Sequence, residues 1–418
     1  MTLIDCDHRT PPAASTGYPY IAIPQIRNGH IQLDGVRRIS SEHFAEWTRK
    51  LKPQANDVLV VRRCSSGDSA VVPPGLDCAI GQNLVVLRSN GKRVLPEFLR
   101  WLVNTPEWWE QVGKFINVGA VFDSLKCREI PHFRLTVPPI EAQREIATLL
   151  GALDNRITLL RETNATLEAI AQALFKSWFV DFDPVHAKQQ GIAPEGMDEA
   201  TAALFPDSFE ESELGLVPKG WKVGTLASVA TLNPESWTVK NHPQTLAYID
   251  LANAKDNEIA AVTDYLFDEA PSRARRVLRS GDTIVGTVRP GNRSFAFIHQ
   301  AGNNLTASTG FAVLRPNMKI NTEFVYLDAT QDSSIEHLAH VADGGAYPAV
   351  RPEVVAGMQC ILPSREVMEA FHGVTAPLLA SVAENQKKAQ TVSTLRDTLL
   401  PRLISGKLRL PEAEALAA

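Results

Sequence analysis

Two long stretches of the chain carry apolar residues at steps of three, four and seven. The first runs from residue 141 to about 179, and the second covers residues 371–399. Such regular spacing over about five heptads predicts two long helices with coiled-coil seams. The predicted seam residues are Leu153, Ile157, Leu160, Asn164, Leu167, Leu378, Val382, Asn385, Val392 and Leu395.

Three polar or helix-breaking residues interrupt these stretches. Asn164 and Asn385 allow two interpretations: a pair on the seam that fixes the helix register, or ordinary surface residues at the edge of an apolar stripe. Pro377 lacks the backbone N–H that a helix interior uses, so we expect it to kink the second helix or to delay its start.

The remaining chain alternates short apolar runs with turn residues. Gly, Pro, Asn and Asp bound these runs, which is typical of strands in mixed α+β domains. The predicted strands lie at residues 58–63, 79–87, 283–288 and 309–314, and short helices are expected at 96–102 and 322–329.

The two halves of the sequence resemble each other. Tyr20-Ile21-Ala22-Ile23 resembles Tyr248-Ile249-Asp250-Leu251, and Val85-Val86-Leu87-Arg88 matches Ala312-Val313-Leu314-Arg315. Further short matches follow in the same order, all at an offset of about 226 residues, which indicates a tandem duplication. We therefore divide the chain into two globular domains (1–138 and 218–363), each followed by a long helix (139–180 and 364–410), with an irregular connector at 181–217.

Charge is distributed unevenly along the chain. The net charge is −5, but the connector alone holds nine acidic residues against one lysine. Residues 271–295 hold six arginines against one aspartate. Because phosphate binding depends on local charge, the acidic total does not exclude nucleic acid as a partner. Solvated surface faces would account for the same charges equally well.

Cysteine usage and hydropathy bear on location. The five cysteines are scattered without a CxxC pair, which favours a reducing compartment. The N-terminus lacks the pattern of a signal peptide, and the apolar runs are shorter than the roughly 20 residues that a membrane span needs. We therefore expect a cytoplasmic protein without a membrane partner.

No catalytic or metal site is predicted. The segment Gly286-Thr287-Val288-Arg289-Pro290-Gly291-Asn292-Arg293 has an asparagine where a phosphate-binding loop needs its lysine. No tetrapeptide of the DPPY or NPPF type, which a base-amino methylase needs, is present. His337 and His340 are spaced to share a helix face but have no carboxylate or cysteine at recognisable spacing, so a metal site there is disfavoured.

Residues suited to DNA recognition remain. Arginine can bridge guanine O6 and N7, and Asn or Gln can do the same for adenine. Other arginines can hold phosphates and position the duplex. The candidates are Arg37, Arg38, Arg62, Arg63, Gln82, Asn83, Arg273, Arg275, Arg276, Arg289, Asn292 and Arg293. A surface ion pair or a strand cap is the competing interpretation for each of them.

Several motifs, in order along the chain, resemble the specificity subunits of type I restriction–modification enzymes. These motifs are Val137-Pro138-Pro139-Ile140-Glu141-Ala142-Gln143-Arg144-Glu145-Ile146, Leu174-Phe175-Lys176-Ser177-Trp178-Phe179, Leu204-Phe205-Pro206-Asp207-Ser208-Phe209, Pro218-Lys219-Gly220-Trp221 and Leu399-Leu400-Pro401-Arg402-Leu403-Ile404-Ser405-Gly406-Lys407-Leu408. Two departures stand out. Asn56 replaces a glycine that the second copy keeps as Gly281, and Glu366-Val367 replaces a Glu-Gln start of the second helix.

The resemblance implies a fold and a function. The globular domains would be two target-recognition domains, each reading half of a split, asymmetric DNA target, separated by two long antiparallel coiled-coil helices with pseudo-twofold symmetry. The helices would bind two methyltransferase subunits and, through them, restriction and translocase subunits. S-adenosylmethionine, ATP and Mg²⁺ would belong to those partners, and this chain would hold no cofactor and no catalytic residue. A nuclease or fused methylase, and a purely structural scaffold, are the alternatives.

Overall fold

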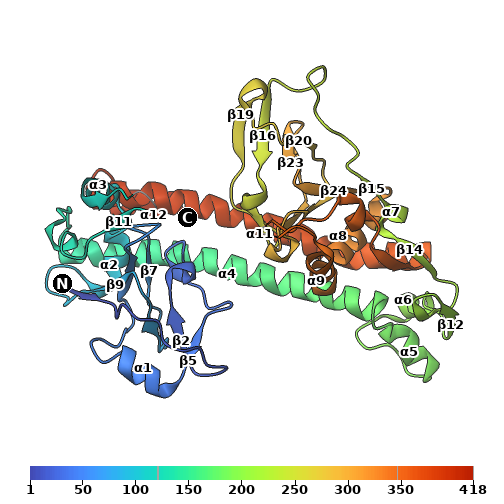
Figure 1. Cartoon of the computed structure of the whole chain (residues 1–418), viewed down its shortest axis with the longest axis horizontal. Coiled ribbons are helices and arrows are strands. Elements are labelled where there is room, and N and C mark those ends of the chain that lie inside the picture. Colours follow the sequence, from blue (N-terminus) through green and yellow to red (C-terminus); the bar gives the residue numbers. More distant parts are fainter. Residues whose placement is uncertain (120–121, 346, 418) are drawn as a thin grey trace. The chain divides into compact units, whose positions relative to one another are not determined.

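The computed structural model describes residues 1–119, 122–345 and 347–417. Residues Met1–Leu159 form one compact unit together with the chain from Lys388 on, and Leu160–Lys387 form the other. We call them unit 1 and unit 2. Each contains one globular domain and a segment of both long helices (Figure 1). The two units are defined by packing and not by the sequence repeat. The predicted division of the chain into two domains, two long helices and a connector therefore stays a prediction.

Two small sheets build the globular part of unit 1. One is an antiparallel sheet of β1 (Thr2–Asp5), β9 (Leu84–Arg88), β6 (Val58–Val61) and β7 (Ser69–Val71), in that order. The other has the order β5 (Arg38–Ile39), β2 (Tyr18–Ile21), β8 (Ala79–Ile80). The remaining elements are the hairpins β3 (Ile26–Arg27) with β4 (His30–Ile31) and β10 (Ile116–Asn117) with β11 (Ser124–Leu125), and the helices α1 (Ser41–Trp47), α2 (Pro96–Leu102), α3 (Pro106–Phe115) and α12 (Leu410–Ala417).

Unit 2 contains two four-stranded sheets. Their orders are β15 (Ala230–Leu232), β24 (Phe311–Pro316), β21 (Asp282–Gly286), β22 (Phe295–Ile298), and β19 (Thr263–Leu266), β16 (Thr245–Ile249), β23 (Leu305–Ser308), β20 (Ala274–Val277). Three strand pairs complete it: β17 (Ala254–Lys255) with β18 (Glu258–Ile259), β12 (Phe209–Ser212) with β13 (Gly215–Pro218), and β14 (Lys222–Thr225) with β25 (Gln359–Leu362). The short helices are α5 (Asp183–Gln189), α6 (Glu199–Ala203), α7 (Leu226–Val229), α8 (Thr322–Thr330), α9 (Asp332–Val341) and α10 (Pro352–Ala356).

The strand connections confirm the tandem repeat. In unit 1, β6 pairs with β9 and β7, and in unit 2, β21 pairs with β24 and β22 in the same antiparallel arrangement. The second sheets also agree, because β2 pairs with β8 in parallel and β16 pairs with β23 in parallel. The short helices α2 and α8 follow the equivalent strands, as the sequence predicts.

A buried ion pair recurs in the two domains. Arg88 donates to Asp57 from Nε at 2.7 Å, and Arg315 donates to Asp282 from Nε at 2.8 Å. Both carboxylates are almost fully buried. The residue before each aspartate has a left-handed backbone, φ 68° at Asn56 and φ 90° at Gly281. Asparagine tolerates this region better than other residues with a side chain, which explains how Asn56 can replace the glycine.

The predicted strand at 79–87 is wrong as a single element. It forms β8 and β9, which belong to different sheets. Asn83 adopts a left-handed backbone with φ 67°, which turns the chain between the two strands. Buried apolar residues lie on both sides of the break, and Gln82 and Asn83 between them are partly buried, so the segment resembles one strand with a short polar interruption.

The two long helices have 40 residues each and are α4 (Ile140–Phe179) and α11 (Arg365–Ile404). At 1.5 Å per residue each is about 60 Å long. Pro377 does not delay α11, which begins at Arg365. Phe371 and Leu379, on either side of the proline, are buried in the core of unit 2, and this burial offsets the backbone hydrogen bond that proline cannot make.

The connector is more regular than predicted. It contains α5, α6 and the hairpin β12–β13. Val185, Phe205 and Val217 from this segment are buried in the main core of unit 2, beside Trp178 and Trp221. Turn residues mark the ends of these short elements, and their frequency in the sequence predicts a mostly irregular segment. Among the described residues, no helix combines the length and the apolar character that crossing a membrane requires.

We predict that the stability of unit 2 depends on pH through Asp328. This side chain on α8 is 6% exposed, and burial raises the pKa of its carboxyl to about 7. Because the folded state favours the protonated acid, stability should fall as pH rises from about 4 to 7. The urea midpoint of the wild type should therefore decrease between pH 5 and pH 8, and that of Asp328→Asn should change less. Equal pH profiles for the two proteins would contradict this assignment, and Asp264→Asn on exposed β19 is the matched control.

Candidate nucleic-acid interface

The residues of the first globular domain that are predicted to contact DNA have different surroundings in the structure. Arg37 donates to the backbone carbonyl of Pro11 at 2.9 Å, and Arg38 donates to that of Gly17 at 2.8 Å. Gln82 donates to Thr10 Oγ1 at 3.0 Å. These contacts fix loops of the domain and use part of the hydrogen-bonding capacity of each side chain. Asn83 serves the turn described above.

The adjacent arginines Arg62 and Arg63 differ most clearly. Arg62 is half-buried, and its guanidinium lies 3.4 Å from Asp5. Arg63 is exposed, and its guanidinium carbon lies 5.3 Å from the ring centre of Phe122, within the range of a cation–π contact. Arg62 therefore has a structural contact within the domain, whereas Arg63 projects beside an aromatic ring.

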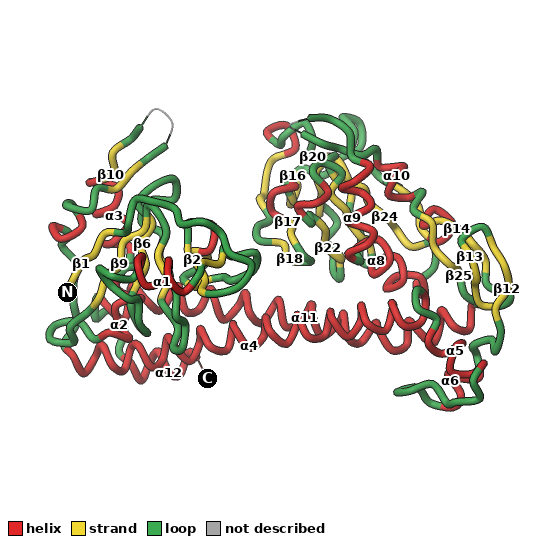
Figure 2. Tube along the Cα trace, turned by 60° about the horizontal axis from the view of Figure 1, so that its bottom comes forward, coloured by secondary structure: helices red, strands yellow, loops and turns green. Residues whose placement is uncertain are grey.

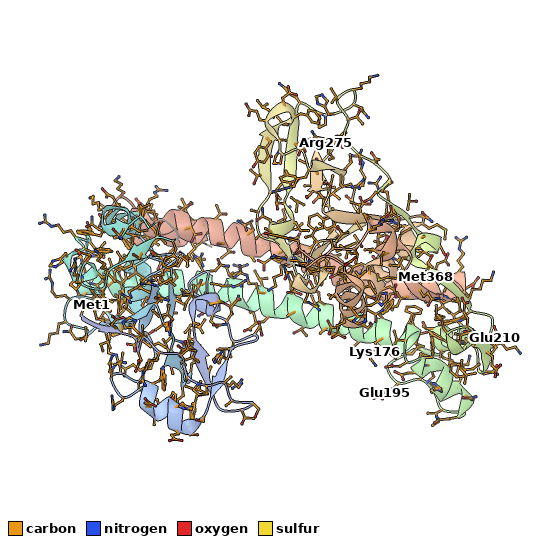
Figure 3. The ribbon with its side chains drawn as sticks, in the orientation of Figure 1. Met1, Lys176, Glu195, Glu210, Arg275 and Met368 are labelled. Atoms are coloured by element: carbon orange, nitrogen blue, oxygen red, sulfur yellow. The ribbon has the colours of Figure 1, made fainter. Side chains whose placement is uncertain are left out.

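The arginines of β20 and the preceding loop are held by the second sheet of unit 2. Arg273 donates to Asp250 at 2.6 Å and to the Tyr248 hydroxyl at 3.1 Å. Arg275 stacks over Phe267, with 4.8 Å to the ring centre. Figure 3 shows Arg275 in the part of unit 2 that holds β16 and β20, away from Met368 on α11.

Arg276 differs from its neighbours by its burial. Desolvation lowers the pKa of its guanidinium, and Nε has no hydrogen-bond partner. One of its terminal nitrogens donates to Ser236 Oγ at 3.3 Å. Both guanidinium Nε atoms that are buried without a partner among the described residues belong to predicted DNA-binding arginines, Arg62 and Arg276.

The spacing of Arg289, Asn292 and Arg293 predicts one cluster of side chains in the turn at residues 289–293. The structure does not bring the two arginines together in this way. Arg289 and Arg293 have left-handed backbones at the two ends of a 3-10 turn, with φ 48° and 59°. Arg289 is exposed and stacks on Tyr347, with 4.5 Å to the ring centre. Arg293 is directed to Asp256 at 2.5 Å and Asp332 at 2.7 Å.

Arg293 lines a cavity of about 490 Å³ whose other wall includes residues of α4, among them Glu168 and Lys176. Asn292 is exposed between the two arginines. The pair of left-handed residues therefore separates Arg289, at the surface, from Arg293, which faces the helix. A sequence pattern does not reveal this, because left-handed arginines are uncommon.

The seam asparagines meet in unit 2. Asn164 is 8% exposed and donates to the carbonyl of Val382 at 3.1 Å. Asn385 donates to Asn164 Oδ1 at 3.0 Å. Of the two interpretations left open by the sequence, the structure shows the paired one. Leu160, Leu167 and Leu378 are partly buried along the same helix segments, and Val382 is buried.

The helix segments of unit 1 also pack through predicted seam residues. Leu153 belongs to an apolar cluster that includes Leu150, Leu399 and Leu403, with Val392 and Leu395 packed against it, and Ile157 is buried. Contacts join earlier residues of α4 to later residues of α11, so the segments are antiparallel within this unit (Figure 2).

A buried carboxylate attaches the first globular domain to the helices. Asp154 on α4 is 2% exposed and lies 3.1 Å from His30, 2.6 Å from Arg100 and 2.5 Å from Arg396. His30 belongs to the hairpin β3–β4, Arg100 to α2 and Arg396 to α11. Burial would raise the pKa of Asp154, but the His30 hydrogen bond and the two guanidinium charges hold it well below its usual range.

Unit 2 has a comparable joint, in which a residue of a hairpin contacts both long helices. Asn257, in the hairpin β17–β18, is 6% exposed and donates to Glu168 of α4 at 2.7 Å. Its carbonyl accepts from Gln386 of α11 at 3.0 Å. The hairpins β3–β4 and β17–β18 occupy equivalent places in the repeat, so both domains use the same element to contact both helices.

Gln143 joins α4 to its own domain. It is fully buried, its Nε2 donates to the carbonyls of Arg93 and Pro138, and its Oε1 accepts from the N–H of Leu95. The glutamine of the helix-start motif therefore serves contacts inside the chain. At the start of α11 the buried Val367 occupies the core instead.

One group of possible metal ligands occurs among the described residues. Donor atoms of Asp5, Cys6 and His8 lie within 4.8 Å of one another. Asp5 also faces Arg62 at 3.4 Å, a cation that opposes a metal ion there. His337 and His340 lie on α9 and are not part of such a group. The spacing of Asp5, Cys6 and His8 matches no metal-binding motif in the sequence analysis.

Comparison with known proteins points to one family. Residues 8–169 match the model of the type I restriction modification DNA specificity domain. The specificity subunit of the type I restriction enzyme HindI from Haemophilus influenzae is 26% identical over 385 residues, covering 79% of this chain and 81% of the relative. That of the MjaIX enzyme from Methanocaldococcus jannaschii is 23% identical over 386 residues, covering 90% and 83%.

Solved structures were compared as well. The S subunit of a type I restriction–modification system from M. genitalium aligns with a TM-score of 0.49 and 14% identity, covering 96% of this chain and 93% of that one. The HsdS subunit from Thermoanaerobacter tengcongensis aligns with a TM-score of 0.32 and 19% identity, covering 94% and 92%.

We predict that Asp154→Ala loosens the first globular domain. The change leaves Arg100 and Arg396 without their buried counter-charge, a loss typically worth about 3–5 kcal/mol. Hydrogen exchange should accelerate in α2 and in β3–β4, with peptides of unit 2 unaffected. Because the carboxyl pKa is depressed, the same stabilisation should disappear in the wild type as pH falls below about 4. The exposed Asp34→Ala is the control, and unchanged exchange in α2 would refute the anchoring role.

Proposed function

The chain belongs to the specificity subunits of type I restriction–modification enzymes, and we propose that its two globular domains each read one half of a split, asymmetric DNA target. In this role it is a non-catalytic subunit that supplies sequence recognition to an enzyme complex. The family model matches residues 8–169, which include most of the first globular domain and much of α4.

The duplicated topology carries this proposal. The same pair of sheets occurs twice, once in each unit, and both copies hold exposed arginines among their surface loops. Two related recognition domains of different sequence suit a target with two unlike halves. In each copy some of the predicted contacts, such as Arg63 and Arg289, remain exposed, and these are the strongest candidates for reading base edges. Arg62 and Arg293, whose groups face acidic residues, are better suited to supporting loops.

The remaining features of the assembly follow from the same proposal. We assign residues 1–138 and 218–363 to the two target-recognition domains, and residues 139–180 and 364–410 to helices that bind two methyltransferase subunits. Restriction and translocase subunits would join through these. S-adenosylmethionine, ATP and Mg²⁺ would be bound by the partners, and the complex would act on double-stranded DNA in the cytoplasm.

We further propose that α4 and α11 set the distance between the half-sites. Each helix is about 60 Å long, which corresponds to roughly 17 base pairs of B-DNA as an upper limit for the separation of the domains. Antiparallel contacts such as Asp154–Arg396 in unit 1 and Asn164–Asn385 in unit 2 would fix the register that this spacing needs.

The direct test is co-purification with the methyltransferase subunit of the same system, followed by mapping of methylated adenines in host DNA. Modification at one asymmetric, split sequence, lost when this chain is deleted, is the expected result. A stable complex that modifies no such sequence would contradict the proposal and favour a structural scaffold. Methylation or cleavage by the purified chain alone would favour the enzyme alternative.

Helix length provides a second test. Removing one heptad from α4 and the facing heptad from α11 shortens the pair by about 10 Å, or roughly three base pairs. We expect modification to shift to targets with a shorter spacer while both half-sites stay the same. Removing a heptad from α4 alone is the control, because it breaks the register and should abolish modification. An unchanged spacer in the double deletion would rule out the helices as the spacing element.

A further inference from the structure

Each globular domain presents an arginine stacked on an exposed aromatic ring at an equivalent place. In the first domain Arg63 stacks on Phe122, and in the second Arg289 stacks on Tyr347. Phe122 is 43% exposed and Tyr347 is 72% exposed. We call each arginine and ring, together with the glycine described below, the aromatic tip of its domain.

Backbone contacts show that the two tips are copies of one structure. A bridge joins Arg63 to Ser124 in the first domain, and Val288 to Ala349 in the second. The backbone N–H of Cys64 donates to Asp123, and that of Arg289 donates to Pro348. This alignment places Phe122 opposite Tyr347.

The same alignment places Arg289 one position beyond Arg63. The ring is therefore retained at one backbone position, whereas the arginine is supplied from either of two neighbouring positions. A combination that persists although one member has moved points to the pair itself as the useful feature.

A glycine shapes the loop in both tips. A Cβ atom on Gly119 would lie 2.5 Å from the carbonyl oxygen of Phe122, and one on Gly344 would lie 3.1 Å from that of Tyr347. Gly344 also has a φ of 109°, which side-chain residues rarely adopt. Both tips therefore favour glycine three positions before the ring residue, because a side chain there would crowd the carbonyl of that residue.

The first tip follows a strand that lies away from the long helices of its unit. Figure 2 shows β10, which leads into this loop, well away from α4 and α12. One face of the exposed ring is already covered by a guanidinium, so contact with an anionic ligand such as DNA costs little further desolvation. In duplex DNA an aromatic ring can make apolar contact with a thymine methyl group in the major groove, and arginine binds both guanine edges and phosphates. A protein partner would need a wider apolar surface than a single ring provides.

We propose that the aromatic tips are DNA-contacting elements, one for each half-site. The ring of Phe122 or Tyr347 packs against bases exposed in a groove, and the stacked arginine donates to a guanine edge or to the adjacent phosphate. This inference rests on the proposed function, because it assumes that each domain reads one half of the target. It adds the rings and their glycines, which sequence reasoning did not select, to the recognition surface.

The experiment uses the complex of the chain with its methyltransferase subunits and the DNA target found by methylation mapping. Phe122→Ala and Tyr347→Ala are compared with the ring-preserving Phe122→Tyr and Tyr347→Phe. Binding is measured to duplexes in which either half-site is replaced in turn. We expect each alanine variant to bind its target about ten-fold or more weakly, with relaxed discrimination at one half-site only, and each ring-preserving variant to bind like the wild type.

The two alanine variants are controls for each other, since each should leave the opposite half-site unaffected. If both alanine variants bind the split target as well as the wild-type complex does, the role of the tips is overturned and the proposed function stays intact. Loss of complex formation with the methyltransferase subunits would instead identify the tips as a protein-binding surface, which also overturns the inference. Failure of the wild type to recognise any split target would count against the proposed function itself.

Discussion

One buried carboxylate joins three elements of unit 1 to the helix α4. Asp154 has almost no contact with water, so its charge is tolerable only because two guanidinium groups and the His30 ring surround it. Those side chains come from a hairpin, a short helix and the second long helix. One residue of α4 thereby fixes the orientation of the first globular domain and the pairing of the helices together. The surface loops that present Arg63 and Phe122 depend on this fixed frame.

Unit 2 solves the same problem mainly with amide groups. Asn257 bridges the two helices through Glu168 and Gln386, and Asn164 with Asn385 joins the helices directly. Amide pairs are directional, so they define register without the cost of burying a charge. The duplication has therefore kept the sheets and the docking hairpin while the chemistry of the joint has diverged.

Periodicity was sufficient to predict the long helices, their seam residues and the repeat, because these depend on patterns that extend over many residues. It failed at the run 79–87, where Asn83 turns the chain between two buried strands. It also failed for the turn at 289–293, where two arginines with left-handed backbones have different partners. Asp154 and Asn257 could not be assigned from sequence, because their partners are brought together only by folding. The rings of Phe122 and Tyr347 were missed because a lone aromatic residue in a loop has no pattern around it.

The different joints limit how freely the two recognition domains can be exchanged between chains. A domain that brings His30 and Arg100 to a helix without an aspartate at the position of Asp154 would leave Arg100 without its counter-charge and His30 without its hydrogen-bond partner. A domain that brings Asn257 would need an acceptor such as Glu168 on its new helix. Recombination can therefore move sequence specificity from one chain to another only if the crossover lies within the helix, beyond the anchoring residue, so that domain and anchor are inherited together.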